Sequence, residues 1–334
     1  MFDKDMLKSI LAAYGPSGRE QTVSDVIRSY VEPFADEVYN DTLGNLIAVK
    51  KGTSGKKVML SAHMDQIGLI VVDIDEKGFL RVSNVGGVNP VVSLAREVQF
   101  ENGTHGVTYF ETEKHGAKDA TMPELFVDIG ATTREEAEAK VQIGDVAVYL
   151  TNFVEVGSCV SSGALDDRIA CAAVVEAFRT MQNVHDVYAV FTVQEEVGLR
   201  GAGAAAYAIE PDLNISLDVT GTGDTPKCGR MSVKLGAGAT VKVMDSSVIV
   251  PPVVRAFLAE AADGKNIRWQ PEVLRAGGTD TGAVQRTRGG ILSGCISIPT
   301  RYIHSPVETA DMGDYEAAVQ LVCAAVAKQE LPHR

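Results

Sequence analysis

Histidine and carboxylate side chains recur in this sequence at the ends of apolar, strand-like runs and at the start of one predicted helix. The segments are residues 62–65 (AHMD), 163–168 (GALDDR), 194–198 (QEEVG), 214–220 (NISLDVT) and 299–308 (PTRYIHSPVE). Imidazole nitrogen and carboxylate oxygen are ligands of Zn²⁺, Co²⁺ and other divalent cations. Gathered at one place in a fold, such side chains could hold metal and activate water for hydrolysis.

His63 and Asp65 come directly after the short apolar run at residues 57–62. Residues two apart in a strand point the same way, so both side chains are expected on one side of the strand end. A carboxylate beside a histidine can hold the ring in the orientation needed for metal ligation. Taken alone, this pair also fits an ordinary surface turn.

Two further strand-like runs end in acids. Glu195 and Glu196 follow the run at residues 187–193, and Asp218 lies at the end of the run at residues 214–219. Adjacent strand residues face opposite ways, so the two glutamates are expected to have different roles. Taken alone, glutamates at a strand end also fit a solvated surface.

Asp166 and Asp167 open the helix predicted at residues 167–181. One acid at a helix start is explained as an N-cap, but two adjacent acids exceed that need. A carboxylate here has two oxygens and could bridge two cations. His304, which follows the apolar run at residues 291–298, supplies a second histidine.

Two histidines and three carboxylates at one sheet edge suit a pair of divalent cations. If one carboxylate is shared, each cation has three protein ligands and keeps a position for water. Two-metal sites lower the pKa of a bridging water and polarise a carbonyl, and one further acid could act as general base. The other four histidines are expected in solvated turns or at the terminus, and they are His105, His115, His185 and His333.

The elements that must position these segments alternate between helix and strand over most of the chain. Helical spacing predicts helices at residues 3–13, 21–31, 167–181, 199–208, 251–262 and 314–328. Strands are predicted at residues 57–62, 187–193, 214–219 and 291–298, with two more between residues 37 and 50. This alternation predicts an α/β fold with a mixed, mostly parallel sheet covered by helices. Ligand sites of open α/β sheets lie at the carboxyl ends of the strands, where the acids and histidines are expected.

Residues 68–155 differ from the rest of the chain, with short strands broken by Gly and Asn turns. Such a stretch is typical of a small barrel or sandwich. We therefore expect a split α/β domain made of residues 1–67 and 156–334. A small β domain at residues 68–155 would be inserted into it.

Composition argues against several classes of protein. The chain has 334 residues, and 31 Lys and Arg against 44 Asp and Glu give a formal net charge of −13. This balance works against nucleic acid and acidic membrane surfaces as partners, and no apolar run approaches the length of a membrane span. Five scattered cysteines form no C-x-x-C pair, which favours buried, reduced thiols and a cytoplasmic protein. Any metal must then be held by nitrogen and oxygen.

Together, the motifs AHMD, ALDDR, QEEVGLRGA, GGTDTGA and TRYIHSPVE resemble those of the M42 metallo-aminopeptidases, in order and over nearly the whole chain. Relatives include tetrahedral (TET) aminopeptidases, glutamyl aminopeptidases and enterobacterial proteins provisionally named aminopeptidases, and some members have been labelled endoglucanases. The resemblance implies a dinuclear zinc exopeptidase-like fold with a PDZ-like inserted β domain. It also implies release of N-terminal residues from short peptides, with two Zn²⁺ or Co²⁺ ions per subunit. Self-association, from dimer to tetrahedral dodecamer, would be served by the inserted domain.

The resemblance implies a role for each matched position. Glu195 would be the general base that takes a proton from the bridging water, Asp65 would orient His63, and Asp166 would bridge the metals. The implied metal ligands are His63, Asp166, Glu196, Asp218 and His304. The implied substrate-pocket residues are Gly278, Thr279 and Asp280.

Three alternatives stay open. M20-like deacylases and carboxypeptidases share H-x-D and E-E, but their extra domain enters later, whereas here it lies between His63 and Asp166. An endoglucanase-type glycoside hydrolase could use Glu195 and Glu196 but would give no role to two histidines. A single Trp also offers little surface for stacking on sugars. A non-catalytic shell protein would not need the full set of ligands and base.

The preferred N-terminal residue of the substrate also stays open. Acidic, aliphatic and broad preferences all occur among relatives. Basic side chains near the expected site would favour an acidic substrate, but they are also explained as solvated or structural charges. They are Arg275, Arg286, Arg288 and Arg301.

Overall fold

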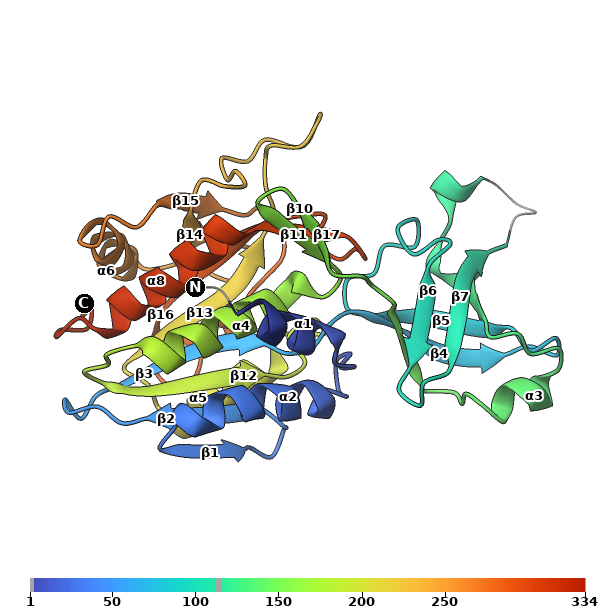
Figure 1. Ribbon diagram of the computed structural model, residues 1–334, viewed down its shortest axis with the longest axis horizontal. Helices are drawn as coiled ribbons and strands as arrows, with labels where there is room; N and C mark the ends of the chain where they lie inside the picture. Colours follow the sequence, from blue (N-terminus) through green and yellow to red (C-terminus); the bar gives the residue numbers. More distant parts are fainter. Residues whose placement is uncertain (1–2, 112–115, 334) are drawn as a thin grey trace.

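A large sheet with helices on both faces forms one part of the molecule, and a closed β barrel forms the other (Figure 1). The computed structural model describes residues 3–111 and 116–333. Within these residues the sheet has 11 strands. This is the α/β fold expected from the alternation of helix and strand, with an antiparallel barrel in the stretch that was expected to be all-β.

Four parallel strands form the centre of the sheet. In order across the sheet they are β12 (Asp186–Thr192), β3 (Lys57–His63), β13 (Leu213–Thr220) and β16 (Leu292–Arg301). Their side chains are mostly buried on both faces, which explains why each strand reads as a nearly continuous apolar run. Because the strands are parallel, their carboxyl ends lie along one edge of the sheet.

Shorter strands extend the sheet on both sides. Next to β12 lie β2 (Leu46–Lys50) and then β1 (Glu37–Asn40), both antiparallel to their neighbours. The strands beyond β16 are β17 (Glu308–Asp311), β11 (Cys159–Ser162), β10 (Val154–Val156), β14 (Ala239–Met244) and β15 (Trp269–Val273). The chain therefore returns from the barrel into the sheet through β10 and β11, directly before the Asp166 segment.

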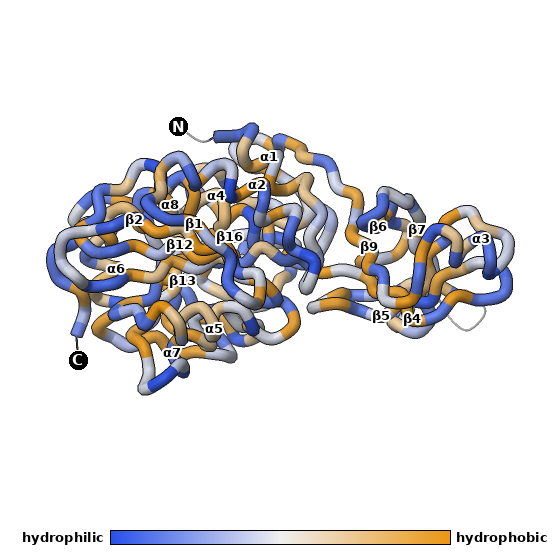
Figure 2. The backbone as a smooth tube through the Cα atoms, turned by 90° about the horizontal axis from the view of Figure 1, so that it is seen from below, coloured by the Kyte–Doolittle hydropathy of each residue, from blue (hydrophilic) through white to orange (hydrophobic). Residues whose placement is uncertain are grey.

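Separate apolar cores cover the two faces of the sheet. The larger core packs five helices on one face: α1 (Lys4–Ala12), α2 (Gln21–Val31), α4 (Leu165–Thr180), α6 (Pro252–Asp263) and α8 (Met312–Val326). The smaller core packs α5 (Arg200–Ile209) and α7 (Asp280–Gln285) on the other face. Apolar and polar segments alternate along the chain in both parts of the molecule (Figure 2). Among the helices of the described residues, none is long and apolar enough to cross a membrane.

The barrel has its own apolar core. Its strands are β4 (Gly68–Ile74), β5 (Leu80–Val85), β6 (Glu97–Phe100), β7 (His105–Phe110), β8 (Leu125–Asp128) and β9 (Val146–Tyr149). The short helix α3 (Arg134–Glu138) lies between β8 and β9. Three 3₁₀ turns complete the described elements: Glu32–Phe34, Ala117–Asp119 and Met122–Glu124.

Most predicted elements lie within three residues of the observed ones, and the predicted helix at residues 21–31 is α2 itself. Sequence reasoning missed five short elements, because a strand or helix of four to six residues gives little periodicity to detect. They are β11, β14, β15, β17 and α7.

Two expectations about side-chain exposure were wrong. His185 is only 1% exposed, and its ring lies between the hydroxyl of Ser54 at 2.6 Å and the carbonyl of Lys328 at 3.1 Å. Cys228 is exposed, although all five cysteines are free as expected. His105 and His333 are exposed as expected, whereas His115 lies outside the described residues.

Candidate metal centre

The predicted segments meet at the carboxyl edge of the four parallel strands. His63 is the last residue of β3, Asp218 lies near the end of β13, and His304 follows β16. The Glu195–Glu196 pair follows β12, which lies beside β3 in parallel register. Asp166 reaches the same place from the start of α4, where the backbone of Asp166 and Asp167 is not yet helical. Parallel strand direction therefore explains why residues so distant in sequence come together.

These side chains form groups that share one carboxylate. Ligand atoms within 4.8 Å of one another define one group of His63, Glu195 and Asp218 and a second group of Asp166, Glu196 and His304, and Asp166 also forms a third group with Asp167 and Asp218. Oδ1 of Asp166 is 3.1 Å from Nε2 of His63, and Oδ2 is 3.3 Å from Nε2 of His304. One carboxylate therefore faces both histidines, as a bridging ligand must.

Both histidines turn Nε2 toward the carboxylates because a backbone carbonyl holds Nδ1. Nδ1 of His63 donates to the carbonyl oxygen of Asp65 at 3.0 Å, and Nδ1 of His304 donates to that of Gly87 at 3.0 Å. Metal-ligating histidines are commonly oriented by such a bond. Gly87 belongs to the loop that follows β5 of the barrel, and a Cβ atom there would lie 2.6 Å from the His304 ring. The barrel therefore contributes to the site, a contact that sequence reasoning missed.

The carboxylate of Asp65 holds the backbone of the glutamate pair. Its Oδ1 accepts a hydrogen bond from the N–H of Glu195 at 2.9 Å, and its Oδ2 accepts one from the N–H of Glu196 at 3.2 Å. The hydroxyl of Ser17 also donates to Oδ2, at 2.6 Å. Oδ1 lies 3.5 Å from Nδ1 of His63, so Asp65 contacts that ring more closely through its carbonyl oxygen.

Glu308 holds a second pair of ligand-bearing segments in the same way. One oxygen of its buried carboxylate accepts from the N–H of Asp166 at 2.9 Å, and the other accepts from the N–H of His304 at 2.8 Å. Sequence reasoning missed this residue, although it stands in the TRYIHSPVE motif at the start of β17. Its place after a tight turn gave no periodic signal that its side chain would face inward.

Burial concentrates negative charge at this site. Burial raises the pKa of Glu195, Asp218 and Asp167 well above their usual values, and neighbouring carboxylates add to the shift. Burial disfavours the charged form of His63, but the carboxylates around it, with Glu195 and Asp166 foremost, outweigh this and raise its pKa well above its usual value. Among the described residues, Oδ1 of Asp167 is buried without a hydrogen-bond partner. Nitrogen and oxygen donors crowded in this way fit divalent cations.

The three predicted substrate-pocket residues are placed differently from one another. Gly278 lines a cavity of about 530 Å³ that also contacts the histidines and carboxylates. Thr279 and Asp280 are buried and do not line it. Thr279 donates to Asp245 at 3.2 Å, and Asp280 accepts from the hydroxyl of Thr192 at 2.6 Å. Burial raises the pKa of Asp280 to about 6.

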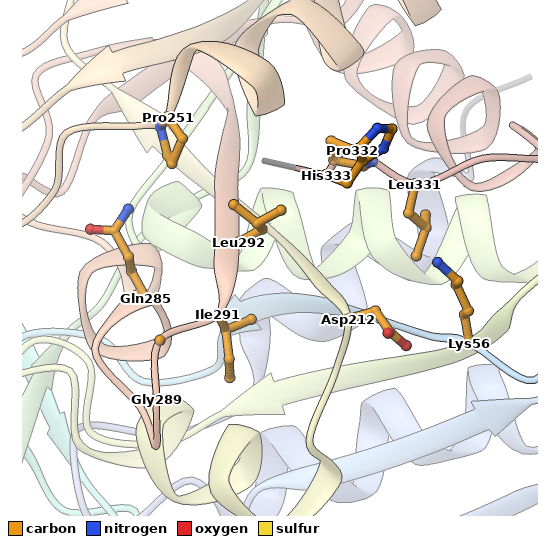
Figure 3. Close-up of a pocket in the computed structure, with 11 residues that line it drawn as sticks. Lys56, Asp212, Pro251, Gln285, Gly289, Ile291, Leu292, Leu331, Pro332 and His333 are labelled. Atoms are coloured by element: carbon orange, nitrogen blue, oxygen red, sulfur yellow. The ribbon is translucent and has the colours of Figure 1, made fainter.

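A second cavity, of about 480 Å³, lies at the opposite edge of the sheet (Figure 3). Lys56, Asp212 and Ile291 line it just before β3, β13 and β16 begin. Figure 3 shows Lys56 and Asp212 together on one side and Pro251 on the other. None of the metal-ligand groups found among the described residues lies there. The cavity at the carboxyl edge is therefore the candidate active site.

Comparison with known proteins agrees with this location of the chemistry. The family model described as M42 glutamyl aminopeptidase matches residues 44–321, which contain all of the histidines and carboxylates of the site. The chain belongs to the M42 family. M42 peptidases are metal-dependent, and the grouped ligands described above could hold metal.

Three M42 relatives show how far this similarity extends. A protein of Acetivibrio thermocellus, provisionally named an aminopeptidase, is 50% identical to this chain, and the alignment covers 96% of this chain and 98% of the relative. The lysyl aminopeptidase of Pyrococcus furiosus is 38% identical to this chain, and the alignment covers 97% of this chain and 96% of the relative. The solved structure of the TET1 peptidase of Pyrococcus horikoshii superposes on this chain with a TM-score of 0.87 at 31% identity, and the match covers 97% of this chain and 99% of the relative. That relative can assemble into a tetrahedron or a large octahedral shell.

This M42 chain is therefore a peptide-hydrolysing enzyme of the aminopeptidase class. The family model and the full-length curated relatives carry aminopeptidase names, which favours this class over the M20-like and glycoside hydrolase alternatives, although one solved relative, from Thermotoga maritima, is titled an endoglucanase (30% identity, TM-score 0.82). The non-catalytic alternative fits poorly with a site that brings together all the expected ligand types.

Proposed function

We propose that the chain is a dinuclear metal-dependent aminopeptidase that releases the N-terminal residue of short peptides. The observation that carries this proposal is the position of Asp166, whose two oxygens face the Nε2 atoms of His63 and His304. A shared carboxylate between two imidazoles would offer each of two cations a nitrogen ligand and a common oxygen ligand. Zn²⁺ and Co²⁺ both suit this donor set.

The ligand assignment follows the two groups of side chains. His63 and Asp218 would hold one cation, Glu196 and His304 the other, and Asp166 would contact both. When bound, the pair of cations would lower the pKa of a water molecule between them and polarise the scissile carbonyl.

Glu195 is the proposed general base. It lines the cavity, and its Oε2 lies 3.8 Å from Nε2 of His63, farther than Oδ1 of Asp166 at 3.1 Å. Its carboxylate would take a proton from the attacking water and deliver it to the departing amine. The carboxylate of Asp65 holds the backbone N–H of Glu195 and so positions this residue.

The first test is hydrolysis of aminoacyl-p-nitroanilides and short peptides by the full chain, with added Co²⁺ or Zn²⁺ and with chelator. We expect single N-terminal residues to be released, and chelator to abolish the release. If the chain remains active when metal analysis shows that its site is empty, the metal-dependent mechanism is contradicted. Metal-loaded protein that is silent on every free-amine substrate would contradict the assignment of an N-terminal peptide bond as the target.

Replacing Glu308 with Gln tests the support of the metal site. An amide has one acceptor oxygen, so only one of the N–H groups of Asp166 and His304 would keep its partner. We expect divalent-cation affinity to fall about 10- to 100-fold, the usual effect of losing an outer-shell partner. Titration calorimetry with Co²⁺ measures this affinity directly, and the absorption spectrum of bound Co²⁺ reports any change in ligand geometry.

The matched control for Glu308→Gln is Glu316→Gln, the same substitution at an exposed position on α8. We expect its cation affinity and Co²⁺ spectrum to equal those of the unchanged chain. If Glu308→Gln behaves like this control, Glu308 does not position the ligands.

We also propose that residues 1–67 and 156–334 form the catalytic domain and that residues 68–155 serve self-association. The exposed side chains of Val107 and Tyr109 on β7 support this proposal, because apolar surface of this kind commonly marks a protein interface. The Pyrococcus horikoshii relative assembles into closed shells. Light scattering on the purified chain tests the proposal, and a monomer at micromolar concentration would contradict it.

A further inference from the structure

The cavity wall outside the metal-ligand cluster is aliphatic. Its aliphatic residues are Leu199, Val219, Leu274, Ala276 and Ile303, and the rest is glycine apart from Thr220. Gly277 and Gly278 lie between the two leucines. A Cβ atom on Gly277 would lie 3.5 Å from Cδ2 of Leu274, and one on Gly278 would lie 3.8 Å from Cδ1 of Leu199. The two leucines therefore flank one glycine turn and form adjoining parts of the wall.

No Lys or Arg belongs to the cavity lining in the described part of the chain. None of the four arginines that could have bound an acidic substrate lines the cavity, although Arg275 lies between the lining residues Leu274 and Ala276. Arg275 is exposed and outside the lining, and the other three bind protein groups of their own. These partners are Asp224 for Arg301 at 2.8 and 3.0 Å, Glu210 for Arg288 at 2.9 Å, and the carbonyl of Gly282 for Arg286 at 2.8 Å.

Carboxylates in the cavity are equally unavailable to a basic substrate. The lining carboxylates are Asp166, Glu195, Glu196 and Asp218, and each already has a role in the proposed metal site. A lysine or glutamate side chain entering the cavity would therefore lack a partner of its own. A charged group removed from water without a partner is strongly disfavoured.

On the basis of the proposed function, we propose that the enzyme prefers peptides whose N-terminal residue has an uncharged aliphatic side chain, with Leu199, Leu274 and Ile303 forming the wall that receives it. This preference differs from the one in the name of the lysyl aminopeptidase relative. It follows from the side chains of this chain and from the placement of its arginines.

The test compares kcat/KM of the metal-loaded full chain for leucyl-, alanyl-, glutamyl- and lysyl-p-nitroanilide, which share one leaving group. We expect the leucyl substrate to exceed the alanyl one by about tenfold or more and the charged ones by about 100-fold. A glutamyl or lysyl substrate that matches or exceeds the leucyl one would overturn the proposal while leaving the aminopeptidase assignment intact. Absence of chelator-sensitive release from all four substrates would instead overturn the assignment itself, and this proposal with it.

A pair of variants locates the preference in the wall. Leu274→Arg places a cation beside the substrate side chain, and we expect the glutamyl-to-leucyl ratio of kcat/KM to rise by about tenfold or more. Leu43→Arg makes the same substitution at an exposed turn outside the cavity and should leave that ratio unchanged. If folded Leu274→Arg keeps the ratio of the control, Leu274 does not contact the substrate side chain. The comparison of substrates on the unchanged chain does not depend on the folding of either variant.

Discussion

Glu195→Gln is expected to reduce kcat by about 10²- to 10⁴-fold, the usual contribution of general acid–base catalysis. The amide has nearly the same shape as the carboxylate but cannot accept a proton from water. The backbone N–H of this residue would keep its bond to Asp65, so the loop should not move. Steady-state kinetics of the metal-loaded variant on leucyl-p-nitroanilide measures the loss.

Metal content and folding of Glu195→Gln should match those of the unchanged chain. His63 and Asp218, which lie in one group with Glu195, are the proposed ligands and would still hold the cation. Glu316→Gln, the exposed control, is expected to keep full activity. A Glu195→Gln variant with near-normal kcat would remove Glu195 as the base, whereas loss of metal would mark it as a ligand.

Asp166→Asn is expected to have the largest effect on metal binding. Its two carboxylate oxygens face both histidines, whereas Asn offers one oxygen and an NH₂ group that cannot act as a ligand. The remaining oxygen can serve one cation only. Because loss of an outer-shell partner alone costs about 10- to 100-fold in affinity, we expect at least this loss for the shared ligand. Elemental analysis after dialysis and Co²⁺ titration measure it.

Two comparisons sharpen this result. His63→Ala removes a ligand from one group only, so we expect it to lose one cation before the other. Asp25→Asn, at an exposed position on α2, should retain the full metal content. Unchanged metal content in Asp166→Asn would refute the bridging assignment.

How well each helix or strand could be predicted from the sequence depended on its length. The four central strands and the long helices could be predicted because a buried strand or an amphipathic helix repeats its pattern several times. The strands β11, β14, β15 and β17 and helix α7 are too short for such a repeat. The burial of His185 was missed for a different reason, because a turn in the sequence gives no sign that Lys328, 143 residues away, will cover the ring.

The sequence by itself determined the chemistry available to this protein. Histidine and carboxylate residues at strand ends, together with strands that alternate with helices, predict ligands gathered at one sheet edge. Both features are local, because side-chain type and strand direction can be read from neighbouring residues.

Only the tertiary structure decided how these ligands are held and which substrates they meet. The bond from Asp166 to Glu308 joins residues 142 apart in the chain, and that from His304 to Gly87 joins residues 217 apart. The aliphatic wall likewise combines Leu199, Leu274 and Ile303 from three separate loops. Contacts of this range depend on how whole elements pack, and no local period in the sequence encodes that packing.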